Sequence, residues 1–171
     1  MKTYKLIQDE DAANPRTEWD NLGTMVCFHK NYILGDRGHT YDTNDYSNWD
    51  ELEADIRKRE NVAVILPLFL YDHSGITMNT TGFSCRWDSG QVGFIFISKA
   101  KALKEFGGKI VTKKLRERLE KYLKNEVETY DQYLRGDVWG VKIFEDGEEI
   151  DSCWGFYGYD YAELEAKAMC E

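Results

Sequence analysis

The stretch VAVILPLFLY, residues 62–71, is the longest apolar run in the chain. It is about half as long as a membrane-spanning helix, which needs about twenty residues. A continuous apolar run of this length predicts a central strand with both faces buried. Pro67 cannot donate a hydrogen bond to a neighbouring strand, so we expect a bulge or an unpaired side there. The second strongest strand signal is QVGFIFI, residues 91–97.

The rest of the chain supplies further strands and helices. Alternating residues predict strands at 3–8, 25–30, 138–144 and 149–154. Capping residues and apolar stripes predict helices at 48–59, 98–107, 112–134 and 161–170. Asp146-Gly147 is a strong hairpin signal between the last two strands. We therefore expect an α+β fold, with an antiparallel or mixed sheet of five to six strands and three to four helices packed mainly on one face.

The length of the chain and the lack of a linker segment favour one soluble unit. With 171 residues and two prolines, the chain has no Pro-rich linker, and residues 1–171 are expected to form a single domain. The N-terminus reaches acidic residues before an apolar segment could form, so we expect no secretory signal and a cytoplasmic protein. The four cysteines have no CxxC spacing and are expected to be reduced. No Gly-rich phosphate-binding motif occurs, so no cofactor is expected.

Charge is unevenly distributed along the chain. The net charge of −9 divides into −5 over residues 1–61, +4 over residues 62–144 and −8 over residues 145–171. An acidic protein is a poor candidate for nucleic-acid binding by general electrostatic attraction. The acidic C-terminal segment instead favours a basic partner. Its hairpin carboxylates are therefore candidate binding residues, chiefly Glu145, Glu148 and Glu149.

The most informative polar segment is HSGITMNTTGFSCRWDSG, residues 73–90, between the two strongest strands. Connections longer than about twelve to fifteen residues without structure of their own are usually functional. If the flanking strands pair antiparallel, the two ends of this segment lie at the same end of the sheet. The predicted working surface comprises Asp72, His73, Ser74, Asp88 and Ser89, with Phe83 and Trp87 beside them.

Three interpretations compete for this surface. Asp72 or Asp88 could orient His73 as a general acid–base pair, and a hydroxyl of either serine or the thiol of Cys85 would complete a nucleophilic triad. A metal ion would recruit His29 together with His73 and Asp88. Neither chemistry has a supporting motif, since GxSxG, HExxH and CxxC are all missing. The third interpretation is that the Asp and Ser side chains cap their own turns.

Helix 112–134 carries a row of cations in its first half: Lys113, Lys114, Arg116, Arg118, Lys121 and Lys124. Such a row could bind nucleic acid. The interleaved carboxylates Glu117, Glu120, Glu126 and Glu128 favour an ordinary solvated face instead. Nucleic-acid binding through residues 113–124 is therefore a minor alternative, and direct contact with nucleic acid is not expected.

Three stretches resemble a family of small proteins that phages, plasmids and integrative elements encode. They are LPLFLYDHSGITMNTTGFSCRWDSGQVGFIFISK (within residues 65–99), EVETYDQYLRGDVWG (126–140) and DSCWGFYG (151–158). The likeness extends over residues 19–158, but the family has no assigned activity, so it implies no functional residue. It implies an accessory protein of a mobile element, in the cytoplasm of a bacterial host. Some such proteins are acidic and block host restriction or CRISPR systems.

These observations rank three functions. The leading hypothesis is an acidic interaction protein that binds a host or phage protein, such as a nuclease or defence factor. The first alternative is a small hydrolytic or metal-assisted enzyme built on residues 72–90, and the second is a nucleic-acid-binding accessory factor. No membrane partner is expected. The sequence makes no prediction of the oligomeric state.

Overall fold

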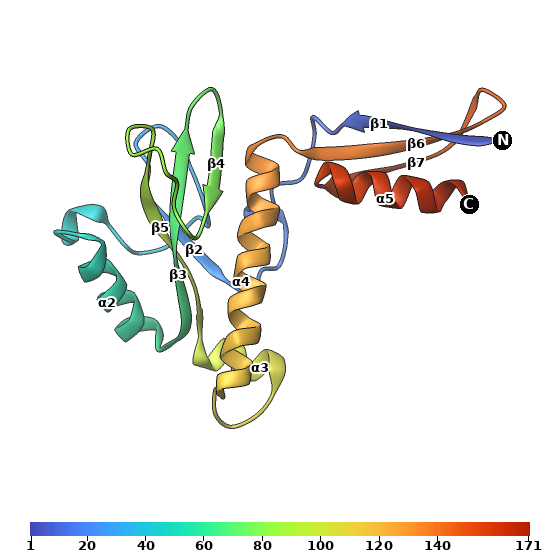
Figure 1. Ribbon diagram of the computed structural model, residues 1–171. Coiled ribbons are helices and arrows are strands. Elements are labelled where there is room, and N and C mark those ends of the chain that lie inside the picture. Colours follow the sequence, from blue (N-terminus) through green and yellow to red (C-terminus); the bar gives the residue numbers. More distant parts are fainter. The chain divides into compact units, whose positions relative to one another are not determined.

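The computed structural model describes residues 1–171, which form two compact units (Figure 1). Unit 1 comprises Met1–Pro15 and Thr129–Glu171, and unit 2 comprises Arg16–Glu128. The structure combines antiparallel sheets with α-helices, so the predicted α+β class is confirmed. The chain has seven strands in two sheets and five α-helices, more than the five to six strands and three to four helices expected. The single domain of residues 1–171 stays a prediction.

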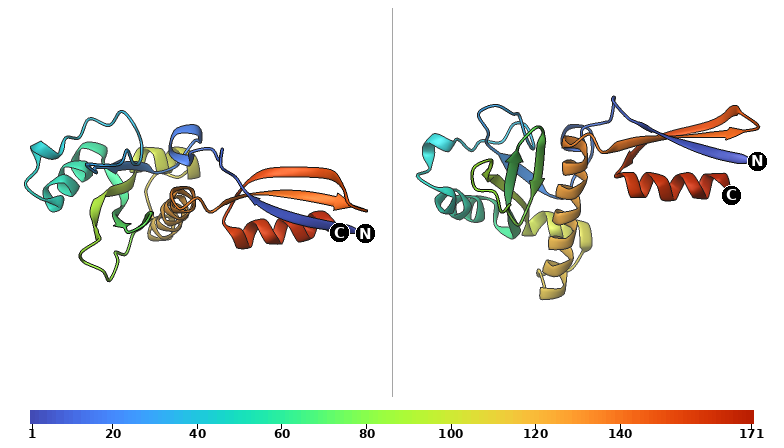
Figure 2. Two further views of the ribbon diagram at one scale, coloured as in Figure 1. Left: turned by 90° about the horizontal axis from the view of Figure 1, so that it is seen from above. Right: turned by 45° about the horizontal axis from the view of Figure 1, so that its top comes forward.

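Unit 1 contains a three-stranded antiparallel sheet in the order β1-β6-β7. Its elements are β1 (Lys2–Gln8), β6 (Val138–Glu145), β7 (Glu148–Tyr157) and α5 (Tyr159–Cys170). Helix α5 lies along one face of the sheet (Figure 2), where Val141 and Ile143 pack with Ala166. The hairpin forms as predicted, because Asp146 and Gly147 have the positive φ angles, 52° and 90°, of a type I′ turn.

Unit 2 contains a four-stranded antiparallel sheet in the order β2-β5-β3-β4. Its strands are β2 (Thr24–Cys27), β3 (Val62–Asp72), β4 (Ile76–Asn79) and β5 (Ser89–Ser98). The internal strands β3 and β5 contain the two apolar stretches that predicted them. At Pro67, β3 pairs with β5 alone, because β4 pairs only with residues 69–72. Pro67 thus lies where one side of β3 has no strand partner, as expected.

Helices cover both faces of the unit 2 sheet, which corrects our prediction of one covered face. The helices are α1 (Pro15–Glu18), α2 (Trp49–Glu60), α3 (Lys99–Phe106) and α4 (Lys113–Leu134), of which α4 continues into unit 1. Phe94 and Phe96 of β5 pack with α2. Ile95, between them, points to the other face, where it lies with Leu123 of α4 beside Gly23. Because alternate residues of β5 contact opposite helices, the strand is apolar throughout.

The ends of the helices follow the capping signals of the sequence. Asn48, Ser98 and Thr112 each accept a hydrogen bond from the backbone N–H three residues later, at 2.9, 3.2 and 3.2 Å. These bonds satisfy donors that the first turn of a helix leaves unpaired. No helix of the structure has the length and apolar character that crossing a membrane requires.

The segment of residues 73–90 is not the structureless loop that we predicted. It contains β4, which returns along Phe69–Asp72 of β3 after a tight turn. Ser74 and Gly75 have positive φ angles in that turn, 57° and 147°. Strand β4 escapes prediction because its sequence, ITMN, is short and half polar. The segment is therefore a short hairpin followed by a return loop of nine residues, 80–88.

Candidate functional site

The two ends of the 73–90 segment lie together, as the sequence predicts. Tyr71 of β3 is paired with Ser89 of β5, and the Asp72 N–H donates to the carbonyl of Asp88 at 2.8 Å. His73 Nδ1 lies 3.2 Å from Oδ2 of Asp88. The pairing of β3 with β5 thus places the imidazole and the carboxylate within hydrogen-bond distance.

Asp72 is held by a tyrosine that the sequence did not reveal as a partner. The hydroxyl of Tyr32 donates to Oδ1 of Asp72 at 3.1 Å, and this hydrogen bond raises the pKa of Tyr32. The ring of His29 stacks on Tyr32, with 4.9 Å between ring centroids. His29, Asp72, Trp87 and Asp88 line one hollow of about 420 Å³. Tyr32 comes from a distant polar segment, so no local pattern links it to Asp72.

The structure does not assemble a nucleophilic triad around His73. The hydroxyl of Ser89 donates to the carbonyl of Cys85, four residues earlier, which is a turn-capping role. The Cys85 thiol lies 4.0 Å from Oδ2 of Asp88, and Ser74 has no hydrogen bond to His73. The side chains of His73 and Asp88 are 64% and 41% exposed, so water competes for their contact. The pair alone could transfer a proton, but it has no positioned nucleophile.

The predicted metal ligands do not converge. Across residues 1–171, no three His, Cys, Asp or Glu side chains gather as a metal site would require. His29 uses its Nδ1 to accept the backbone N–H of Asn31 at 3.1 Å. The two aromatic residues predicted at this surface differ from each other. Trp87 is 96% exposed, whereas Phe83 lies against Tyr71 with ring centroids 5.6 Å apart.

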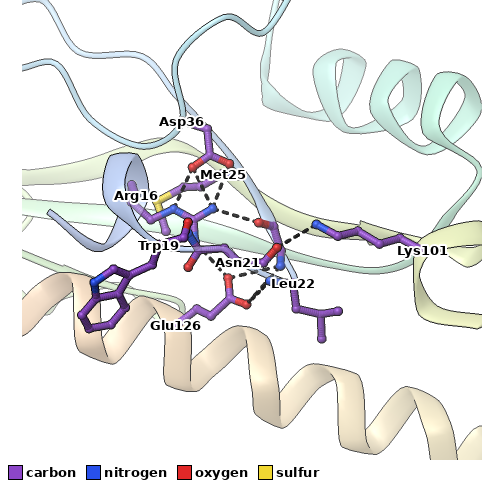
Figure 3. A network of polar contacts seen from close by, with 9 residues as sticks. Arg16, Trp19, Asn21, Leu22, Met25, Asp36, Lys101 and Glu126 are labelled. Carbon is purple, nitrogen blue, oxygen red and sulfur yellow. Dashed lines mark hydrogen bonds and ion pairs between the residues drawn. The ribbon is translucent and has the colours of Figure 1, made fainter. Parts of the chain in front are cut away.

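A polar cluster in unit 2 surrounds the buried residue Arg16 (Figure 3). Its guanidinium is fully buried and donates to both carboxylate oxygens of Asp36 at 2.7 and 2.8 Å. It also donates to Glu126 at 2.9 Å and to the carbonyl of Gly23 at 2.8 Å. Burial alone lowers the pKa of Arg16, but the hydrogen bonds and charges of the two carboxylates outweigh it and raise the pKa.

The carboxylates of this cluster also bind the backbone between α1 and β2. Glu126 accepts the N–H groups of Leu22 and Gly23 at 2.7 and 3.1 Å, and Asp36 accepts that of Met25 at 2.9 Å. Because every ionised group has partners, the cluster fastens loops to α4 rather than awaiting a substrate. The sequence held one overlooked signal. Glu126 falls within the apolar stripe of the predicted helix, a position that indicates burial. A buried carboxylate requires a cation as its partner, so the sequence implied one for Glu126.

Unit 1 carries all of the net charge of the chain. It has 14 acidic and 5 basic residues, net −9, whereas unit 2 has 17 of each and is neutral. Its cations are largely engaged within the unit. Lys142 pairs with Glu149 at 2.8 Å, and the N-terminal ammonium of Met1 pairs with Asp146 at 3.2 Å. Glu145 and Glu148, by contrast, are exposed and have no cation partner.

The acidic hairpin also exposes apolar side chains. Residues 148–155 of β7 are all exposed, and β7 has a strand partner on one side only. Ile150 and Trp154 are 49% and 47% exposed. The Trp154 ring lies over Gly140 of β6, where a Cβ atom would come 2.2 Å from it. Carboxylates and large apolar groups thus occupy the same strand.

Comparison of the chain with family models, with curated proteins and with solved structures finds no match.

Proposed function

We propose that the protein is an interaction protein whose unit 1 binds a basic surface of another protein. One observation carries the proposal: the whole net charge of −9 belongs to unit 1, and unit 2 is neutral. Concentrated like charges repel each other, so their accumulation in the smaller unit has a cost that a binding function explains. Solubility alone requires no such concentration.

The composition of β7 and its hairpin supports this interpretation. Protein interfaces combine a core rich in aromatic and apolar side chains with a polar rim. Trp154 and Ile150 supply candidate core residues, and Glu145, Glu148 and Asp151 supply a charged rim. Exposed carboxylates accelerate encounter with a basic partner, and the apolar contacts slow its dissociation.

The resemblance to proteins of mobile elements suggests the kind of partner. An acidic accessory protein of a phage or plasmid would act in the cytoplasm of its bacterial host. A host nuclease or defence factor with a basic nucleic-acid-binding surface offers the complementary charge. In this proposal the protein acts against host defence by occupying that surface. The resemblance supports a nuclease or defence factor as the partner, and the negative charge of unit 1 supports a basic surface on that partner.

The test is a comparison of two variants with equal charge changes. The first neutralises exposed carboxylates of unit 1: Glu145→Gln, Glu148→Gln and Asp151→Asn. The second neutralises exposed carboxylates of unit 2: Asp20→Asn, Asp45→Asn and Asp50→Asn. Pull-down from bacterial lysate, followed by identification of the bound proteins, should give the same basic partner with wild type and the unit 2 variant. Loss of that partner with the unit 1 variant alone supports the proposal, and equal capture by all three proteins contradicts it.

A second candidate function is proton transfer by His73 and Asp88, favoured by the 3.2 Å contact between them. A carboxylate that accepts from an imidazole raises its basicity, as a general base requires. Hydrolysis of ester substrates by wild type and by His73→Gln tests it. If the variant retains full hydrolytic activity, or if wild type has none, this candidate fails.

A further inference from the structure

The corner formed by α3, the following loop and the first half of α4 is strongly basic. Residues 99–124, the α3–α4 surface, contain ten Lys or Arg residues and three Glu residues, net +7. This charge is hidden in the neutral total of unit 2. It is the densest positive segment of the chain.

Two of the four carboxylates interleaved with these cations in the sequence are engaged in ion pairs in the structure. Glu126 does not face solvent with them, because it is bound to the buried Arg16. Glu120 is taken up by Lys124, whose Nζ lies 2.6 Å from its carboxylate. Glu117 and Glu128, together with Glu105 of α3, remain as exposed carboxylates without a cation partner. The solvated face of α4 thus exposes more unpartnered cations than unpartnered carboxylates over residues 113–124.

Most cations of the α3–α4 surface have no ion pair or side-chain hydrogen bond. The unpartnered set is Lys99, Lys104, Lys109, Lys113, Lys114, Arg116 and Lys121. The two helices are fixed to each other by aromatic contacts. Phe106 of α3 lies 5.5 Å from Tyr122 of α4, and the guanidinium of Arg118 sits 4.5 Å over the Phe106 ring. The cations consequently project from two helices that these contacts hold together.

We propose that the α3–α4 surface binds the phosphodiester backbone of a nucleic acid. The row from Lys113 to Lys124 is about 16 Å long, at 1.5 Å per helical residue. That length spans about five nucleotide steps of 3.4 Å. Tyr122 is 39% exposed beside Arg118, and such a pair can stack on a base. The inference is independent of whether unit 1 binds a basic protein.

An anionic membrane is the competing polyanion. Ile110, in the loop between α3 and α4, is 71% exposed and follows Lys109 directly. One aliphatic side chain buries too little apolar area to anchor a protein to lipid. A row of cations with an adjacent Arg–Tyr pair matches a linear nucleic acid better than it matches a lipid surface. Binding to lipid vesicles is the alternative outcome of the test.

The experiment measures fluorescence anisotropy of labelled 20-nucleotide single-stranded and 20-base-pair DNA with the full chain in 50 mM salt. The test variant is Lys113→Gln, Lys114→Gln and Lys121→Gln. Glutamine has nearly the helix propensity of lysine, so α4 should persist. The control variant changes the same net charge elsewhere in unit 2: Lys30→Gln, Arg37→Gln and Lys58→Gln, all exposed.

We expect wild type and control to bind at least one of the two DNAs equally, and the test variant to bind at least 10-fold more weakly. With about four phosphate contacts, the wild-type affinity should fall about 100-fold between 50 and 200 mM salt. Three results overturn the proposal: no binding of either DNA at 50 mM salt, equal weakening in both variants, or binding of phosphatidylserine vesicles but not DNA. Circular dichroism of each variant excludes unfolding as the cause of weakened binding.

Discussion

The ionised side chains around Arg16 in unit 2 and the carboxylates of the unit 1 hairpin lie in opposite environments. In unit 2, Arg16 is buried between Asp36 and Glu126, and each of its hydrogen bonds ties a loop to the fold. In unit 1, Glu145 and Glu148 are exposed and have no cation partner. A buried pair needs fixed geometry and full hydrogen bonding, whereas exposed charges act over about 8–10 Å through solvent. The ions around Arg16 therefore have a structural role, whereas Glu145 and Glu148 of unit 1, like the cations of the α3–α4 surface in unit 2, are free to contact a partner.

The largest expected effect comes from removing the buried cation of unit 2, compared with a paired cation of unit 1. Arg16→Met should lower the free energy of unfolding by about 3–5 kcal/mol, because it leaves two partly buried carboxylates without their counter-ion. Lys142→Met in unit 1 breaks an exposed pair with Glu149 and should cost less than about 1 kcal/mol. Urea denaturation measures both values. Equal losses would remove the distinction between structural and available charges.

The same denaturation curves test the single-domain prediction. If residues 1–171 unfold as one domain, circular dichroism and tryptophan fluorescence should give coincident transitions. Unit 2 contains Trp49, which packs against its core cluster, together with Trp19 and Trp87, and unit 1 contains Trp139 and Trp154. Variants that keep only the tryptophans of unit 1, or only those of unit 2, report the unfolding of one unit each. Different transition midpoints in the two variants would show two domains.

The next effect compares two glycines at close approaches. A Cβ on Gly93 would lie 1.9 Å from the carbonyl oxygen of Val26, so Gly93→Ala must force strands β2 and β5 apart. We expect a loss of about 3 kcal/mol or more. The three atoms nearest to a Cβ on Gly140 all belong to the Trp154 ring, which is about half exposed and can move away. Gly140→Ala should therefore cost about 1 kcal/mol, and thermal unfolding of both variants decides between these expectations. A greater loss from Gly140→Ala than from Gly93→Ala would show that the unit 1 sheet is the more rigid one.

A smaller effect distinguishes the thiols of the two units. Burial raises the pKa of Cys27 in unit 2 from 9.0 to about 12. Because the raised pKa favours the protonated form in the folded state, its stabilising contribution is complete below pH 9 and is lost as the pH rises towards 12. Cys153 of unit 1 is exposed. At pH 8 a thiol reagent should modify Cys153 first and Cys27 last.

The pH dependence offers a matched control for the same thiol. Unfolding free energies at pH 8 and pH 11 should differ more for wild type than for Cys27→Ala, which lacks the titrating group. Rapid modification of Cys27 in the folded protein, or identical pH dependence in both proteins, would contradict its burial.

The smallest expected change in stability belongs to the exposed loop of unit 2. His73→Ala and Trp87→Ala should each alter the free energy of unfolding by less than about 0.5 kcal/mol, since both side chains are exposed. Any biological phenotype that depends on this surface should nevertheless be lost. A large destabilisation by both changes would identify the loop as part of the core and end its functional interpretation.

Local signals predicted the elements of both units better than their arrangement. The apolar runs of β3 and β5, the caps Asn48, Ser98 and Thr112, and the Asp146-Gly147 turn each depend on neighbouring residues, which a sequence displays directly. The division into two sheets depends on pairing between β1 and β6, more than 120 residues apart. Nothing local in either strand specifies that partner, so the sequence suggested one sheet.

The candidate site shows the same limit. Convergence of His73 with Asp88 was predictable because antiparallel pairing of adjacent strands fixes it. The hydrogen bond from Tyr32 to Asp72, 40 residues apart, was not. The role of Glu126 was misjudged because charge alternation suggested solvent, although its place in the apolar stripe indicated burial. Charges could be counted from the sequence, but their partners required the structure.

The central claim is that the charge of unit 1 recruits a basic partner, and association kinetics test it most directly. Stopped-flow or surface-based association rates should be measured for the partner identified by pull-down, between 50 and 500 mM salt. Wild type and the unit 2 variant (Asp20→Asn, Asp45→Asn, Asp50→Asn) should associate rapidly at low salt and slow steeply as salt rises. The unit 1 variant (Glu145→Gln, Glu148→Gln, Asp151→Asn) should associate more slowly, with a shallower salt dependence and an unchanged melting temperature. Identical rates and salt dependence for all three proteins would contradict the claim.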